Sequence, residues 1–139
     1  MNMTKKISAV VIALALLAGT FFIPGNAWAA DNVVKVAKKG GVGRYLTDFK
    51  GMTLYVYTKD SEGKSACLGE CLVKWPIYYQ EKVAARSGLN ARSFGNFTRI
   101  DGKKQTTYKG MPLYYSSEDK VAGDTNGQGI EDTWFIVAP

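Results

Sequence analysis

The two cysteines of the chain, Cys67 and Cys71, are the residues whose type and spacing most directly suggest chemistry. They stand four apart in a segment that predicts a short helical turn ending before Pro76, so both thiols face one side at a Cα separation that a disulfide tolerates. In an oxidising compartment this pair predicts a structural bridge. The alternative is a thiol-based copper or redox site, with the thioether of Met52 or Met111 as a third ligand.

Histidine is absent from all 139 residues. Imidazole is the usual general base near neutral pH and the commonest metal ligand. Its absence excludes Ser-His-Asp and Cys-His hydrolases and the His-ligated zinc, blue-copper and non-haem iron sites. We therefore expect no resident cofactor, with copper as the alternative.

Two carboxylates, Asp60 and Asp119, recur at equivalent places in the chain, each just after an expected strand. We interpret both as turn-capping groups that accept backbone N–H bonds. The alternative is a pair of acids brought together for acid/base chemistry. We expect a non-enzymatic protein, with an enzyme that works through these two carboxylates as a further alternative.

A glycine-rich loop near the C-terminus has the alternating oxygen side chains of a calcium loop, with Gly129 in sixth place. Its candidate ligands are Asp124, Asn126, Gln128 and Asp132. The twelfth position is Phe135 rather than a bidentate Glu, so a turn with local Asp and Asn bonds explains the same residues.

Residues 1–29 have the organisation of a secretory signal peptide. Lys5 and Lys6 precede the apolar stretch Ile7 to Ile23, and Ala27-Trp28-Ala29 is a small-x-small cleavage site. Cleavage before Ala30 predicts one periplasmic or secreted domain, residues 30–139, without stable membrane insertion.

The mature charge is mild. Without Lys5 and Lys6, 16 Lys and Arg stand against 12 Asp and Glu, a net charge of +4 spread along the chain. This pattern does not predict nucleic-acid binding. It is compatible with other envelope proteins or acidic cell-surface polymers as partners.

The chain repeats itself at an offset of 59 residues, with ten identities over the 35 positions from Gly43 to Ile77. Such self-similarity predicts two copies of one structural unit, at about 33–80 and 93–139. The repeated motif comprises Tyr55, Tyr57, Asp60, Trp75, Tyr114, Asp119 and Trp134.

Each copy has the signals of short strands and tight turns. Hairpins are predicted around Lys38-Lys39-Gly40-Gly41 and Asp101-Gly102. Third strands follow at 53–57 and 112–115, and fourth strands begin at Trp75 and Trp134. We thus predict an all-β fold of two four-stranded antiparallel repeat units related by a pseudo-two-fold axis, with a linker at 81–92 that holds a helical turn.

The third strand alternates, which places Leu54 and Val56 on one face and Tyr55 and Tyr57 on the other. Bulk on both faces predicts a position near the middle of a sheet. The tyrosines also suggest a binding face for sugar, peptide or another protein, with Tyr57, Tyr78 and Tyr79 as its candidates.

The stretch Tyr55-Val56-Tyr57-Thr58-Lys59-Asp60 resembles the bacterial secreted-repeat family, described as predicted lipoproteins with a Yx(FWY)xxD motif. The resemblance extends over 43–139 and includes the glycine turns and the two tryptophans. It implies an envelope-associated or secreted β-rich repeat protein and brings no established activity. The second copy departs from the motif, because Ser116 stands where the pattern has an aromatic residue.

The sequence as a whole predicts a secreted or periplasmic binding or structural module of the cell envelope. The alternative function is the thiol-based copper or redox protein that uses Cys67 and Cys71.

Overall fold

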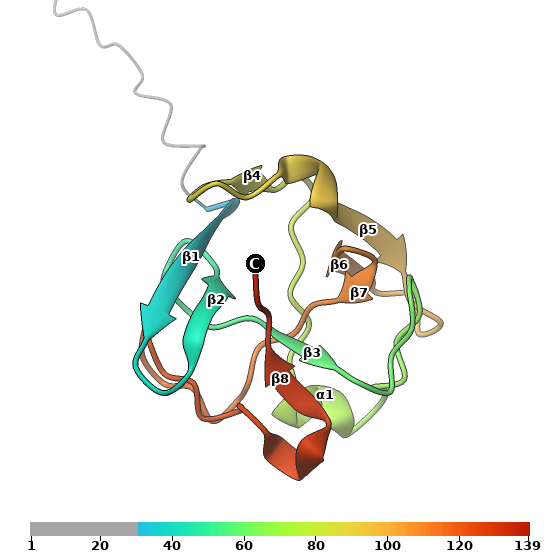
Figure 1. Cartoon of the computed structure of the whole chain (residues 1–139). Helices are drawn as coiled ribbons and strands as arrows, with labels where there is room; N and C mark the ends of the chain where they lie inside the picture. The colour runs from blue at the N-terminus through green and yellow to red at the C-terminus, as the bar shows by residue number, and fades with distance from the viewer. Residues whose placement is uncertain (1–30) are drawn as a thin grey trace, which may run out of the picture.

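The computed structural model describes residues 31–139, so the predicted signal peptide lies outside the described part of the chain. The domain is built mainly of short strands (Figure 1). In chain order the elements are β1 (Val33–Lys39), β2 (Gly43–Thr47), β3 (Tyr55–Tyr57), α1 (Cys71–Lys74), β4 (Ala84–Ala85), η2 (Ala91–Ser93), β5 (Phe94–Thr98), β6 (Lys104–Tyr108), β7 (Met111–Pro112), η3 (Ile130–Asp132) and β8 (Trp134–Ile136).

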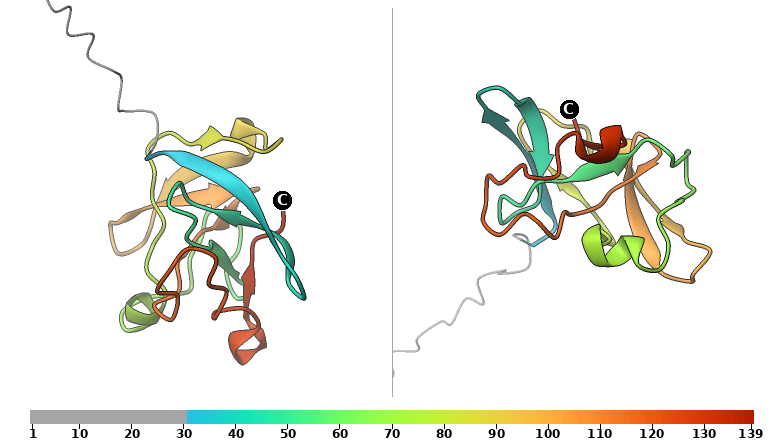
Figure 2. Two further views of the ribbon diagram at one scale, coloured as in Figure 1. Left: turned by 90° about the vertical axis from the view of Figure 1, so that its left-hand side faces the viewer. Right: turned by 90° about the horizontal axis from the view of Figure 1, so that it is seen from below.

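The strands form three small sheets rather than the two four-stranded units that we predicted. Their orders are β2-β1-β4, β3-β8 and β5-β6-β7, and β4 runs parallel to β1. In Figure 1, β3 and β8 cross the middle of the molecule, with the β1–β2 hairpin on one side and β5, β6 and β7 on the other. Seen from below, the two hairpins stand at opposite ends of the domain (Figure 2).

Both predicted hairpins are present. β1 pairs antiparallel with β2, and β5 pairs antiparallel with β6. A further tight turn at Lys109-Gly110 joins β6 to β7, with φ of 49° and 84°. Two successive positive φ values match the right-handed twist of a hairpin, and glycine adopts this conformation without steric cost.

The two repeats exchange their last segments, which is why the predicted units do not close on themselves. Tyr55 in β3 of the first copy pairs with Ile136 in β8 of the second. Tyr114 of the second copy and Ile77 of the first, which are equivalent to Tyr55 and Ile136, form the matching bridge. Tyr55 and Tyr114 also bond to each other, N to O, at 2.8 and 3.0 Å. The contacts are therefore reciprocal, as an approximate two-fold relation requires.

The predicted fourth strand after Trp75 is reduced to the single Ile77 bridge, whereas its counterpart β8 forms as expected. The predicted helical turn near the cysteines is α1. The predicted linker at 81–92 contains β4 and the start of η2.

The constant offset of 59 residues fails before the third strand. Leu46 N donates to Val137 O at 2.9 Å, and Thr106 N donates to Tyr78 O at 3.0 Å. Tyr78 and Val137 are 59 residues apart, but Leu46 and Thr106 are 60 apart. The turn after β2 is one residue longer than the turn after β6, so the identity of Thr47 with Thr106 does not reflect equivalent positions.

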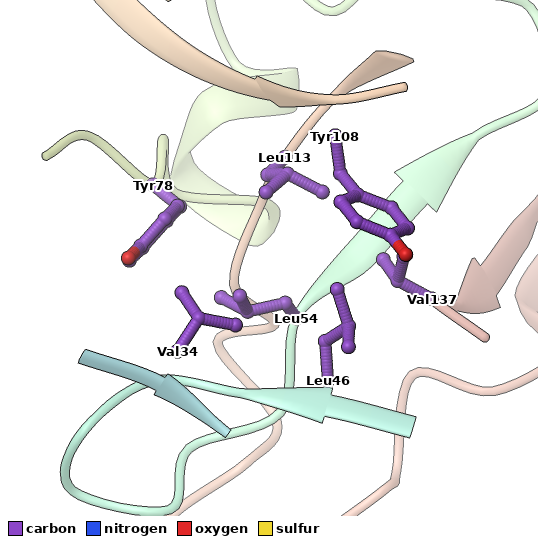
Figure 3. Packing of buried hydrophobic residues seen from close by; sticks show 7 residues of the cluster. All are labelled: Val34, Leu46, Leu54, Tyr78, Tyr108, Leu113 and Val137. Carbon is purple, nitrogen blue, oxygen red and sulfur yellow. The ribbon is translucent and has the colours of Figure 1, made fainter. Parts of the chain in front are cut away.

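Side chains on the two faces of β3 enter two different cores, as the alternation predicts. One core contains Val34, Leu46, Leu54, Tyr78, Tyr108, Leu113 and Val137 (Figure 3). The other contains Tyr55, Cys67, Trp75, Tyr114 and Trp134, and we call it the aromatic core. Tyr55 in β3 and Leu54 just before it are both fully buried, so this segment is central in the domain.

Candidate functional site

The two indoles of the aromatic core and the neighbouring Tyr57 ring stack face to face in a column. The Trp75 and Trp134 ring centroids are 3.9 Å apart at an interplanar angle of 5°. Tyr57 continues the column on the far side of Trp134, at 4.2 Å and 10°. Trp75 follows α1 and Trp134 begins β8, so the exchange of segments between the repeats brings the two indoles together.

Two more tyrosines meet this column edge-on. Tyr55 packs against Trp75 with centroids 5.6 Å apart, and Tyr114 packs against Trp134 at 5.1 Å. Edge-to-face contacts of this kind add to the stabilisation from burial alone, by about 0.5–1.5 kcal/mol per pair. The repeated tyrosines and tryptophans thus form one packed unit.

Each of these tyrosines donates its hydroxyl hydrogen to the aspartate of the other repeat. Tyr55 bonds Asp119 Oδ2 at 2.7 Å, and Tyr114 bonds Asp60 Oδ2 at 2.7 Å. Burial raises the pKa of both tyrosines, and the bond to the aspartate raises it further for each. The rings therefore stay protonated and act as donors.

The aspartates also accept backbone bonds, as the turn-capping interpretation predicts. Asp60 Oδ1 accepts from Ala66 N at 2.7 Å, and Asp119 Oδ1 accepts from Asn126 N at 2.8 Å. Burial raises the pKa of both carboxyls, although their hydrogen-bond donors oppose the shift. Both oxygens of each carboxyl are engaged in holding loops and in joining the repeats.

A buried arginine that was not predicted from the sequence, Arg99, bonds to residues around the aromatic core. Arg99 is 3% exposed, and its guanidinium donates to Ser65 Oγ at 2.7 Å, Gln105 Oε1 at 2.6 Å and Cys67 O at 2.6 Å. It also forms an ion pair with Asp101 at 3.0 Å. An arginine before an Asp-Gly turn has no sequence signal that distinguishes burial from exposure.

Cys67 and Cys71 are joined by a disulfide bond with Cα atoms 5.3 Å apart. Cys67 is fully buried in the aromatic core, and Cys71 packs against that core. Met52 and Met111, the thioethers of the copper alternative, are not among the residues of that core. In residues 31–139, no group of three or more His, Cys, Asp or Glu side chains is placed to hold a metal ion.

The calcium-like loop uses its oxygens locally. Asp124 Oδ2 accepts from Lys120 N at 2.8 Å and from Val121 N at 3.1 Å, and these bonds lower the pKa of the Asp124 carboxyl. Gln128 Oε1 accepts from Ile136 N at 2.7 Å, while Asn126 Nδ2 donates to Glu118 O. Asp132 lies at the end of η3 with a φ of 54°. The bonds formed are those of a structured turn.

The predicted tyrosine face does not form. Tyr78 is 1% exposed and belongs to the core shown in Figure 3, because it pairs with β6 and faces inward. Tyr79 points the other way and is 38% exposed. Tyr57 packs against the aromatic core and stacks on Trp134.

Comparison with known families assigns the chain. A family model described as a secreted repeat of unknown function matches residues 36–78 and 95–138. The chain belongs to this secreted-repeat family. Its two copies are the two halves that exchange segments in the fold. No curated protein and no solved structure matches the chain. Among the described residues, none of the helices has the length and apolar character needed to span a bilayer.

Proposed function

We propose that this secreted repeat protein is a non-enzymatic binding module of the cell envelope. The crossed Tyr55–Asp119 and Tyr114–Asp60 pairs carry the proposal. They commit the two repeated carboxylates to holding the repeats together. The thiols are likewise committed to a bridge in the aromatic core. Because these buried groups have structural roles, we assign the function to the surface of the protein.

The β1–β2 hairpin supports an acidic partner. Lys38 and Arg44 lie directly opposite each other on this hairpin, and both are exposed. Like charges at such a position are destabilising. An anionic polymer lying along the hairpin would offset that repulsion, and the mild positive charge of the mature chain would assist it.

Co-sedimentation of the mature protein with isolated anionic cell-wall polymer tests this function. We expect retention at low salt that weakens as salt rises, because exposed charges are screened. The K38S/R44S variant should lose most of the retention. The K103S/K104S variant removes two charges from the β5–β6 hairpin and should keep it.

Equal loss in the two variants would show a net-charge effect and overturn the assignment to the β1–β2 hairpin. No retention at low salt would overturn the proposed polymer partner. Metal analysis of the same protein, as purified and after reduction, tests the alternative: stoichiometric copper on the reduced thiols would favour the copper protein instead.

A further inference from the structure

The ring column has a stacked tyrosine at one end and none at the other. At the Trp134 end, Tyr57 covers the indole face. At the Trp75 end, the residue equivalent to Tyr57 is Ser116, which has no ring. A cavity of about 380 Å³ lies there, lined in part by Trp75, Ser116, Ser117 and Ile130.

The backbone around the two positions is equivalent, so the comparison is between side chains alone. Asp60 N donates to Tyr57 O at 3.0 Å, and Asp119 N donates to Ser116 O at 3.2 Å. One residue further on, Thr58 N donates to Thr133 O, and the matching bond to Lys74 O comes from Ser117 N, both at 2.8 Å. A side chain leaving Ser116 therefore starts in the setting from which Tyr57 reaches Trp134.

From this correspondence we infer that the cavity beside Ser116 is a binding site for one phenol-type aromatic ring. The occupant of the equivalent place is the phenol ring of Tyr57, which stacks on Trp134. Trp75, of which 5% is exposed, borders the cavity together with Ser116 and Ser117. The Ser116 hydroxyl accepts from Glu118 N at 3.2 Å and keeps its own hydrogen to donate.

The charges around the cavity select among phenols. Lys74, Glu118 and Glu131 are all exposed and line it, which leaves one negative charge in excess. A ring that bears a cationic substituent is favoured over an anionic one of the same size. Because these charges are exposed, we expect a preference of only roughly 2- to 5-fold, which added salt removes.

The cavity is separate from the β1–β2 hairpin and adds a second binding site, for a different ligand class, to the proposed binding module. The probes are p-cresol, tyramine and 4-hydroxyphenylacetate, which are neutral, cationic and anionic. The readout is the indole N–H signals of Trp75 and Trp134 in NMR spectra of the mature protein. We expect saturable shifts, larger at Trp75, with roughly millimolar affinity for so small a ligand.

Filling the cavity should abolish binding. The S116Y variant places a ring there, and its matched control, S61Y, adds the same ring at an exposed serine. We expect p-cresol to shift Trp75 in S61Y and not in S116Y.

A second variant keeps the inference testable if S116Y fails to fold. Y57S creates a cavity like that beside Ser116 at the Trp134 end, so p-cresol should now shift Trp134 as well as Trp75, with two sites in place of one. N-acetyltyrosinamide distinguishes a free phenol from a tyrosine of a partner chain, because only a site open enough for a peptide binds it.

Absence of saturable shifts with any phenol would overturn the inference, as would unchanged binding in S116Y. Binding of methyl glucoside with no phenol binding would overturn it in favour of a sugar site. Polymer retention is measured separately, so a failure here is distinguishable from a failure of the envelope-binding function.

Discussion

Tyr55 of the first repeat donates a hydrogen bond to Asp119 of the second at 2.7 Å, across 64 positions of the chain. Its counterpart, the bond from Tyr114 to Asp60, has the same length and crosses in the opposite direction. Each repeat thus supplies a donor and an acceptor to the other. The most recognisable part of the repeated motif is a clasp between copies, which gives its tyrosine and aspartate a structural role.

Tyr55→Phe should destabilise the protein by about 1–3 kcal/mol, because it removes a donor from the buried Asp119 carboxyl while keeping the ring. Urea unfolding measures this change. Tyr55→Phe also removes the acceptor of the bond from Gly127 N. In a cycle with Asp119→Asn, the two losses should be less than additive, since both variants change the Tyr55–Asp119 bond. Tyr79→Phe is the control at an exposed tyrosine and should change stability by less than about 0.5 kcal/mol. Equal stability of Tyr55→Phe and the wild type would contradict the clasp.

The pH dependence of stability should have a maximum in mildly acidic solution. Burial raises the pKa of Asp60 and Asp119 in the folded state above the ordinary aspartate value of 3.8. The folded state therefore binds more protons than the unfolded state, and the stability from these groups is lost as pH rises through their folded pKa. Unfolding free energy should thus increase as pH falls from neutral towards 3.8.

Below pH 3.8 the unfolding free energy should instead decrease as the pH falls. Hydrogen bonds from Arg99 lower the pKa of Asp101, and backbone bonds from Lys120 and Val121 lower that of Asp124. Their contribution is present above the unfolded pKa and is lost as pH falls through the folded one. The D60N/D119N variant should lack the rise towards pH 3.8 and retain the fall below it. A monotonic loss of stability from neutral pH downward in the wild type would contradict this assignment.

Arg99→Met should destabilise the protein more than the position of Arg99, directly after β5, suggests. Gln105 Oε1 and Cys67 O would each lose a charged donor in a buried setting, at a total cost of about 2–5 kcal/mol. Asp101→Asn tests the ion pair alone. Because Asp101 is an exposed residue with 27% of its side chain accessible, that change should cost less than about 1 kcal/mol. If the two variants lost comparable stability, the contribution of Arg99 to stability would come from the ion pair rather than from the buried hydrogen bonds.

The disulfide should contribute only modestly to the free energy of unfolding. Cys67 and Cys71 close a loop with a sequence separation of 4, which constrains the unfolded chain by only about 2 kcal/mol. We expect the C67A/C71A variant to lose roughly this much plus the packing of the buried Cys67 side chain, and to remain folded by circular dichroism. Complete unfolding on reduction at 25 °C would show that the bridge holds more than its own loop.

The sequence predicted those features that depend on neighbours in the chain. The hairpins, α1 and the alternation of Leu54 and Tyr55 follow from local pattern and turn chemistry. Pairing between copies was not predictable, because β3 meets equivalent side chains whether the last strand comes from its own repeat or from the other. The extra residue in the turn before Met52 was hidden by the chance identity of Thr47 with Thr106.

The candidate site shows the same division. Repetition indicated Tyr55, Asp60, Trp75 and their counterparts, and all of them lie in or against the aromatic core. Tyr78 was misassigned to a binding face because burial depends on the partner strand, which is β6 of the other repeat. The cavity beside Ser116 was visible in the sequence as a missing ring, but its meaning required the ring column.

The exchange of segments makes a further prediction about folding. A fragment of residues 31–92 keeps β3 but loses β8, and its Trp75 loses the stacking partner Trp134. A fragment of residues 93–139 loses the complementary contacts. Neither fragment should fold as a monomer, since each would expose half of the aromatic core and leave a strand edge unpaired.

Mixing the two fragments in equal amounts should restore the fold, because every crossed contact is then available. The tryptophan fluorescence and a cooperative urea transition report on recovery, and sedimentation reports on size. Two molecules of the first fragment can also pair with each other, because Asp60 is equivalent to Asp119 and can accept the bond from Tyr55 of the second molecule. Any folding of that fragment should therefore depend on its concentration. A folded, concentration-independent monomer of either fragment would show that the repeats are self-contained and that the crossed pairing is dispensable.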